Sequence, residues 1–362
     1  MKISLPRSIF SLGSGTKAKD VSRGKFPKVE APSGRLGRAE LGPYAWEDQM
    51  PRWLFKQLEE GPRITMEQHI SRRDGRLVKY EHVENETPGI VPVMAQLSAL
   101  DDHVRTAYLC HPAVIHVGKT YKEGGFCGYR NIHMLVSYIM GAKAQGHGRF
   151  LGQRLPTILR LQEMIEEAWD RGINETGRMQ TGGVYGTRKY IGTAEAQALF
   201  LHLGIETEVD VFSDMKDGPQ AYEQLLATVE QYFREGLDDI AFRQQPTNNS
   251  GNKLRQSDLH PTSSPTVHKT LRAPIYLQQP GHSITIVGFE RRKDGSGNLL
   301  VLDPMFRTSP GMERLVGRSH ISTPRPEVMK PYRRGKRQLG RHRDFEILML
   351  PAKAPSSHAW EL

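Results

Sequence analysis

The sequence contains very little cysteine: Cys110 and Cys127 are the only two in 362 residues. Two thiols form at most one disulfide, which excludes the disulfide framework of a small secreted scaffold and indicates a reducing compartment. They are also too few for a thiolate zinc site, and the histidines show no paired metal-ligand spacing with them. We therefore expect neither a metal ion nor another cofactor.

Long hydrophobic runs are also lacking. No stretch approaches the roughly 18 consecutive apolar residues that a membrane-spanning helix requires, and the first residues contain no continuous apolar segment of the kind found in secretion signals. The start of the chain is rich in Ser and Arg and free of acid up to Asp20, a composition shared with organelle transit peptides. We expect no membrane contact and a location in the cytoplasm, the nucleus or both.

The net charge of +10 is concentrated in two segments. Residues 1–40 carry nine Lys and Arg against three acidic residues, a net of +6, and residues 330–343 carry seven basic residues and no acid. Together they supply +13, which leaves −3 for the rest of the chain. Such basic runs are typical of nuclear targeting, of weak contact with polyanions, or of a solvated tail.

Composition divides the chain into four parts, one of which contains an insertion. Residues 1–40, with few apolar and many Ser, Gly and Lys residues, are predicted to be a disordered basic arm. An N-terminal extension (41–90) and the main domain (91–351) follow, and a short tail (352–362) ends the chain. The polar stretch at 244–270 is predicted to be a mobile insertion within the main domain.

Apolar residues at helical spacing predict helices, and β-like runs bounded by turn residues predict strands. The expected helices cover residues 46–61, 93–109, 157–172, 193–203 and 221–235, and a further one begins at or next to Cys127. The expected strands cover a hairpin within 64–83 and the segments 208–212, 274–290, 298–304 and 344–350. Because most helices precede most strands, the order favours an α+β fold over a repeating βαβ sheet.

Cys127 is a candidate nucleophile. It follows the pair Gly124-Gly125 and lies at a predicted helix N-terminus, where the pKa of a thiol is lowered. The glycines also allow a substrate backbone to approach and leave N–H groups that can stabilise an oxyanion. The alternative is a buried structural cysteine, a description that fits Cys110 better because it has no glycine neighbours.

A cysteine nucleophile needs a general base and a group that orients the base. His282 begins a predicted strand directly after Pro280-Gly281, and Asp303 ends the next apolar strand just before Pro304. Each of the two also fits a purely structural role, as a strand histidine and as a turn former. Their order along the chain, Cys, His, Asp, is that of papain-like proteases.

The pairing of these two strands decides whether His282 and Asp303 meet. A tight turn centred on residues 294–297 places Asp303 opposite Gly288, which is roughly 20 Å from His282 along the strand. A loop of about ten residues instead places Asp303 opposite His282. The sequence is compatible with both arrangements.

Three motifs carry a resemblance to a known family. The segment GGFCGYRNIHML resembles the nucleophile motif of the cysteine proteases that act on the ubiquitin-fold modifier, and of their deubiquitinase branch, the zinc-finger ubiquitin peptidases. PIYLQQPGHSITIVG and LLVLDP resemble the histidine and aspartate motifs of that branch. The modifier-specific branch has an Asp-Pro-His motif, whereas Met305 follows Asp303-Pro304 here, which favours ubiquitin. The chain has no cysteines for zinc fingers and is similar to the short fungal members.

The resemblance implies a papain-like α+β fold in which a helical part carries the cysteine and a mostly antiparallel sheet carries the histidine and aspartate. It implies that Cys127 is the nucleophile, His282 the base and Asp303 its orienting partner. Tyr121 and Thr120 are weak candidates for an oxyanion donor beside the backbone N–H of Cys127. The implied activity is hydrolysis of the bond after the C-terminal glycine of ubiquitin or of polyubiquitin chains, through an acyl-enzyme. The alternatives are a protease for the ubiquitin-fold modifier and a non-catalytic ubiquitin-binding module.

The ubiquitin tail contains arginines and ends in two glycines, so its cleft should offer carboxylates and little space for side chains. Glu195, in the first turn after Gly192-Thr193, is the first candidate to pair with an arginine, and Asp170 is the second. A carboxylate is also favoured at a helix N-terminus for its own sake, so Glu195 has a structural alternative.

Overall fold

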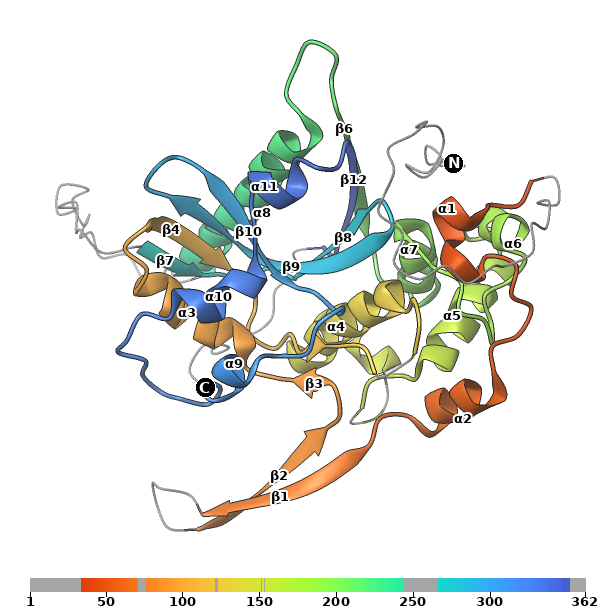
Figure 1. The fold of residues 1–362 in the computed structure, drawn as a ribbon, viewed down its shortest axis with the longest axis horizontal. Coiled ribbons are helices and arrows are strands. Elements are labelled where there is room, and N and C mark those ends of the chain that lie inside the picture. The colour runs from red at the N-terminus through yellow and green to blue at the C-terminus, as the bar shows by residue number, and fades with distance from the viewer. Residues whose placement is uncertain are drawn as a thin grey trace.

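The computed structural model describes residues 34–70, 76–120, 123–150, 152, 154–243 and 266–351. Figure 1 shows helices α4 to α7 gathered on one side of the molecule and an extended sheet on the other. One continuous cluster of buried apolar side chains joins the helices and the sheet. The predicted α+β class is therefore confirmed.

The described residues form helices of very different lengths. The helices of nine or more residues are α2 (Arg52–Glu60), α3 (Ile90–Ala99), α4 (Cys127–Gly141), α5 (Ile158–Asp170), α7 (Thr193–His202) and α8 (Ala221–Arg243). The short ones are α1 (Arg38–Leu41), α6 (Thr176–Thr181), α9 (Pro310–Glu313), α10 (Pro326–Met329) and α11 (Lys336–Leu339). Three 3₁₀ turns lie at η1 (Gly42–Tyr44), η2 (His147–Arg149) and η3 (Lys330–Tyr332).

The strands fall into one large sheet and two small ones. The large sheet contains β4 (Val104–Leu109), β6 (Glu208–Ser213), β7 (Thr266–Lys269), β8 (Ile275–Gln279), β9 (His282–Arg292), β10 (Gly297–Leu302), β11 (Arg333–Arg334) and β12 (Asp344–Met349). The small sheets pair β1 (Ile64–Ile70) with β2 (Leu77–Val83), and β3 (Glu86–Thr87) with β5 (His116–Val117).

The strand β9 organises the large sheet. It pairs with β10 along one edge, and with β8 and then β4 along the other, and all three pairings are antiparallel. The order continues from β8 to β12 and β6, and β7 joins β4 in the one parallel pairing among the described strands. Helix α4 packs against β8 and β9, while α8 lies across the sheet on the side away from α4 (Figure 1).

Several predicted elements are confirmed. The helix predicted from Thr157 begins there, because the Thr157 side chain accepts a hydrogen bond from the Arg160 N–H, and it ends before Gly172. The hairpin predicted within residues 64–83 has its two strands, and they form a ribbon that projects from the body of the molecule (Figure 1). The turn itself lies outside the described residues.

The helix predicted over 93–109 is wrong in its second half. Helix α3 ends at Ala99, and residues 104–109 are the strand β4. A turn at Asp101 separates the two, since its side chain accepts a hydrogen bond from the His103 N–H at 3.0 Å. Alternating Val, Thr and Tyr suit a strand, and pairing with both β7 and β9 decides the outcome.

Two predicted mobile segments are in part well structured. Residues 1–33 of the predicted arm and 244–265 of the predicted insertion lie outside the described residues. The end of the arm is bound to the body, because the Leu36 N–H donates to the Gln180 carbonyl at 2.8 Å and α1 follows. The last residues of the insertion form β7 on the edge of β4.

The basic run at 330–343 is folded rather than a solvated tail. It contains η3, β11 and α11, and β11 pairs with β10. The Arg333 side chain is only 13% exposed, and its guanidinium bonds to Glu290 at 2.8 and 2.9 Å and to Asp101 at 2.8 Å. Glu290 is fully buried and also accepts from Ser98.

This buried ion pair gives a stability prediction. We expect Arg333→Ala to lower the free energy of unfolding by roughly 3 kcal/mol, because it leaves the carboxylate of Glu290 buried without its cation. Chemical denaturation measures the change, and Arg337→Ala, at an exposed position of the same segment, is the control. A loss below about 1 kcal/mol in Arg333→Ala would show that the pair is dispensable.

Candidate active site

Helix α4 presents Cys127 as its first residue, at the point where the sequence predicts a helix start. Gly124 has a φ of +92°, which favours glycine, and the chain turns there before entering the helix. A Cβ on Gly125 would lie 1.7 Å from the ring of Tyr190, so only glycine allows that ring to cover the turn. Side chains on the predicted core face of the helix, including Ile132, Leu135 and Ile139, are buried and hold it in place.

His282 and Asp303 come from adjacent strands. His282 begins β9 after the Pro280-Gly281 turn and lies opposite Gln279. Asp303 follows directly after β10. The Nε2 atom of His282 donates to Oδ1 of Asp303 at 2.9 Å, and the two side chains are 22% and 11% exposed.

Neither of the two strand registers considered for β9 and β10 is correct. The turn is tight but centred near Asp294, with Arg291 opposite Gly297, and the pairing shifts by one residue at Val287. As a result Leu302 pairs with Thr285, so Asp303 follows only about 7 Å from His282 along the strand direction. Side chains span that distance, which is why a tight turn still brings the two together.

The third member of the cluster is the thiol of Cys127, which lies close enough to His282 and Ser283 for both to lower its pKa. Burial opposes a charge on the thiol, but the contacts with His282 and Ser283 outweigh it and lower the pKa of Cys127. Burial likewise opposes a charge on His282, yet its bonds to Asp303 and Cys127 raise the pKa of the imidazole to about 9. The two shifts act in the same direction: the lowered pKa of Cys127 and the raised pKa of His282 both favour a thiolate beside an imidazolium.

Asn131 ties the cysteine helix to the histidine strand. Its amide nitrogen donates to the Cys127 carbonyl at 2.8 Å and to the Ser283 hydroxyl at 3.1 Å. Its amide oxygen accepts from the Thr285 hydroxyl at 2.6 Å. All of these groups except Cys127 are fully buried, so α4 and β9 are fixed relative to each other beside the thiol.

A pocket of about 120 Å³ opens beside Cys127 and His282. Its walls come from residues 36–41, the segment 190–197, strand β6 and the β8–β9 hairpin. Three carboxylates line it: Glu40, Glu195 and Glu346. The residues that line it also include Tyr190, Gly192, Gln278 and Gly281.

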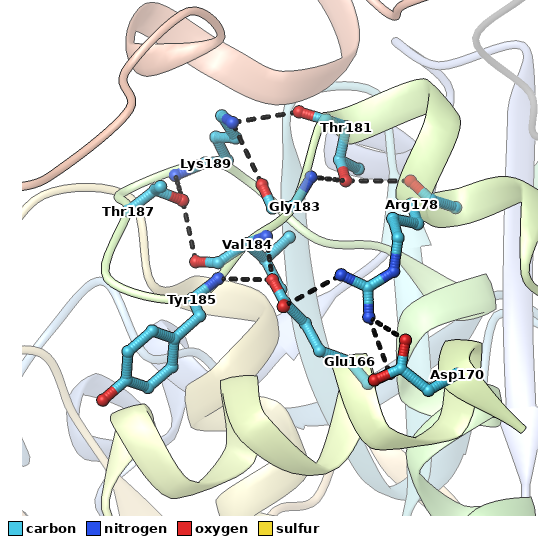
Figure 2. A network of polar contacts seen from close by, with 10 residues as sticks. Glu166, Asp170, Arg178, Thr181, Gly183, Val184, Tyr185, Thr187 and Lys189 are labelled. Atoms are coloured by element: carbon cyan, nitrogen blue, oxygen red, sulfur yellow. Dashed lines mark hydrogen bonds and ion pairs between the residues drawn. The ribbon is translucent and has the colours of Figure 1, made fainter.

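A polar network fixes the chain that leads into this wall (Figure 2). The buried ammonium of Lys189 donates to the carbonyls of Thr181 and Gly183 at 2.9 and 3.0 Å, and burial lowers its pKa. Glu166 accepts from the Val184 and Tyr185 N–H groups at 2.8 and 2.9 Å. These bonds hold the turns before Tyr190 and thereby position the pocket wall.

The structure brings some predicted substrate residues to the pocket and not others. Gly192, Thr193 and Glu195 line it, and Glu195 also accepts from the Gly192 N–H at 2.8 Å, so it caps α7 as well. Burial raises the pKa of Glu195. Asp170 is not among the lining residues; it pairs with Arg178 at 2.6 Å in the network of Figure 2, which accounts for its position.

The structure does not support either residue that the sequence suggested as an oxyanion donor. Tyr121 lies outside the described residues. The Thr120 hydroxyl donates to Glu123 at 2.6 Å, so its proton is already committed. The sequence interpretation missed Gln278, a buried amide that lines the pocket together with Cys127 and His282. The signal that could have identified Gln278 is its position: it lies opposite Ser283 across the β8–β9 turn, and Ser283 is the residue after His282.

In the part of the chain that the structure describes, neither the second thiol nor the charged groups form another site of this kind. Cys110 is fully buried, and burial raises the pKa of its thiol far above the ordinary range. Within the described ranges, no three His, Cys, Asp or Glu side chains are arranged to hold a metal ion. In the same ranges, no helix combines the length and apolar character needed to cross a membrane.

A cysteine at a helix N-terminus, beside a histidine and an aspartate from an antiparallel sheet, defines the class of papain-like cysteine peptidases. Comparison of sequences narrows the class further. The model of peptidase family C78 matches residues 103–348, and the chain belongs to that family.

Similar proteins include two kinds of ubiquitin peptidase. Zinc finger-containing ubiquitin peptidase 1 of Mus musculus is 28% identical over 290 residues, which cover 78% of this chain and 44% of that protein. Ubiquitin carboxyl-terminal hydrolase mug105 of Schizosaccharomyces pombe is 29% identical over 183 residues, which cover 50% of this chain and 60% of that protein. The chain thus spans less than half the length of the zinc-finger relatives.

A solved structure, UfSP from C. elegans, matches with a TM-score of 0.36 and 12% identity over 70% of this chain and 36% of that one. At this TM-score the likeness supports no conclusion about function. The resemblance found in the sequence motifs is nevertheless confirmed by the family match and the ubiquitin peptidases.

Proposed function

We propose that this protein is a deubiquitinase that hydrolyses the peptide or isopeptide bond after the C-terminal glycine of ubiquitin. The observation that carries the proposal is the pairing of Cys127 with His282 and Asp303 at one end of a carboxylate-lined pocket. The names of the related proteins point to the same substrate.

The pocket suits a small, basic chain end. Its volume of about 120 Å³ is well below the roughly 300–1,000 Å³ of pockets that hold whole small molecules. Terminal glycines carry no side chains, so they fit beside the Tyr190 ring. Glu40 and Glu195 lie along the same pocket and can accept hydrogen bonds from the arginines that precede the glycines.

The chemistry follows from the charge pattern. The Cys127 thiolate attacks the carbonyl carbon of the terminal glycine, and the negative charge moves to the carbonyl oxygen. The groups we assign to stabilise that oxygen are the backbone N–H of Cys127 and one N–H of the Gln278 side-chain amide, whose other N–H donates to the Gln279 carbonyl at 3.0 Å. The His282 imidazolium then gives its proton to the departing amine, which leaves a thioester between glycine and Cys127.

During release of the product, His282 acts as a base, whereas it acted as an acid in the first step. Neutral His282 removes a proton from a water molecule, and the resulting hydroxide attacks the thioester carbonyl. The C–S bond breaks, the new C-terminal carboxyl group of ubiquitin loses its proton to solvent and leaves as a carboxylate, and the thiolate and imidazolium are restored. Throughout, Asp303 holds the imidazole through Nε2, so that the other ring nitrogen faces the sulfur.

Two covalent probes test the substrate. We expect ubiquitin with an electrophilic C-terminus to label the full-length protein, and Cys127→Ala to abolish the label because, among the described residues that line the pocket, Cys127 is the one cysteine. The matched probe is the ubiquitin-fold modifier with the same electrophile. Labelling by that second probe alone would overturn the choice of ubiquitin, and labelling by neither would favour a non-catalytic binding module.

A further inference from the structure

The basic run at 330–343 contributes a residue to the site as well as to the core. Strand β11 pairs with β10, with Leu299 opposite Arg334 and Leu300 opposite Arg333. Successive residues of a strand point to opposite sides. Arg333 accordingly enters the ion pair with Glu290, and Arg334 reaches the carboxylate of Asp303. Figure 1 shows α10 and α11, which flank this segment, beside β10.

The Arg334 guanidinium is itself held in place. Its Nη2 atom donates to Oδ2 of Asp303 at 2.9 Å. Its Nη1 atom donates to the carbonyls of Pro331 and Arg333 at 2.7 and 3.1 Å. The side chain is 19% exposed, so water competes little for these bonds. A planar donor fixed at both nitrogens imposes a direction on the carboxylate that it binds.

The hydrogen bonds of Asp303 show what Arg334 adds. Its Oδ1 atom accepts from His282 Nε2 and from the Met305 N–H, both at 2.9 Å. Among the described residues, Arg334 is the hydrogen-bond partner of Oδ2. If hydrogen bonds held Oδ1 alone, the carboxylate could still rotate and carry Oδ2 to another position. With Arg334 present, both oxygens are bound and the plane of the group is set.

The charges along this line alternate: Cys127 thiolate, His282 imidazolium, Asp303 carboxylate and Arg334 guanidinium. We propose that Arg334 is a positioning residue for the hydrolytic reaction, which holds Asp303 so that His282 stays aligned with Cys127. Arg334 does not line the pocket, so it acts on the chemical step and not on substrate binding. This inference rests on the proposed hydrolase function.

The test compares Arg334→Gln with the unmodified full-length protein. We expect kcat for hydrolysis of a ubiquitin C-terminal amide to fall about tenfold, because the loss of one net hydrogen bond to a charged group corresponds to a rate change of about that size. KM should stay unchanged. The alkaline limb of the pH profile should move to lower pH, because a less aligned carboxylate stabilises the imidazolium less. Arg337→Gln, an exposed arginine of the same segment, is the matched control and should leave both unchanged.

A second measurement separates this inference from the choice of substrate. Alkylation of Cys127 by iodoacetamide depends on the thiolate and needs no ubiquitin. We expect Arg334→Gln to slow it at neutral pH, and Arg334→Lys, which keeps the charge, to recover part of the rate. Cys127→Ala, which leaves buried Cys110 as the sole thiol, is the blank.

The outcomes of the two measurements separate the positioning role of Arg334 from the choice of ubiquitin as substrate. If ubiquitin is not hydrolysed but alkylation is slowed in Arg334→Gln, the substrate is wrong and the positioning role stands. If ubiquitin is hydrolysed and Arg334→Gln matches the unmodified protein in kcat, pH profile and alkylation, the positioning role is refuted and the function stands. A loss confined to thermal stability, with unchanged kcat in the folded fraction, also refutes it.

Discussion

Asp303→Asn is expected to lower kcat/KM for a ubiquitin C-terminal amide by about a thousandfold. The change keeps the size of the side chain but removes the negative charge that accepts from His282 Nε2 at 2.9 Å. Without that charge the imidazolium is less stable, and the thiolate loses the partner that lowers the pKa of Cys127. Steady-state hydrolysis measures the effect.

The control for this variant is Asp294→Asn. Asp294 lies in the turn between β9 and β10 and bonds to Ser296, outside the site. We expect its hydrolysis rate to stay within about twofold of the unmodified protein. A loss of less than tenfold in Asp303→Asn would contradict the role assigned to Asp303.

His282→Ala is expected to abolish the reactivity of Cys127 at neutral pH. In the unmodified protein, burial raises the pKa of the thiol, and the contacts with His282 and Ser283 more than reverse that effect. Removing the imidazole takes away the largest of the influences that lower the pKa of Cys127, so that pKa should rise. The rate of alkylation by iodoacetamide as a function of pH measures this shift.

The same pair sets the pH range of activity. The thiolate requires a pH above the lowered pKa of Cys127, and the proton donor requires a pH below the pKa of His282, which is about 9. Hydrolysis should therefore persist through neutral pH and fall as pH rises through about 9. An alkaline limb near 6.5, the ordinary value for histidine, would refute the ion pair.

Much of the local structure could be predicted from the sequence. The apolar spacing of residues 132–140 and the glycines at 124 and 125 are sufficient to place a helix start at Cys127. Thr157 and Gly172 likewise bracket α5. These signals work because caps, glycine and helical periodicity act within a few residues. The helix assigned to 104–109 was wrong since pairing with β7 and β9 overrode a local pattern.

The site needed more than local signals. The motifs in the sequence identified Cys127, His282 and Asp303 as candidates, but not the register that brings the last two together. That register depends on a turn near Asp294 and a one-residue shift at Val287, which local composition does not specify. The pocket wall formed by residues 36–41 was also unforeseen, because composition had assigned residues 1–40 to a disordered arm.

The sequence by itself determined the α+β class, the cysteine at a helix N-terminus and the family motifs, because short-range propensities and motif residues are written directly in the chain. Only the tertiary structure decided which charges meet. Arg333 and Arg334 belong to a run with no acidic residue, yet one lies on Glu290 and the other on Asp303. Their partners are 43 and 31 residues away along the chain, and strand pairing between β10 and β11 closes that distance.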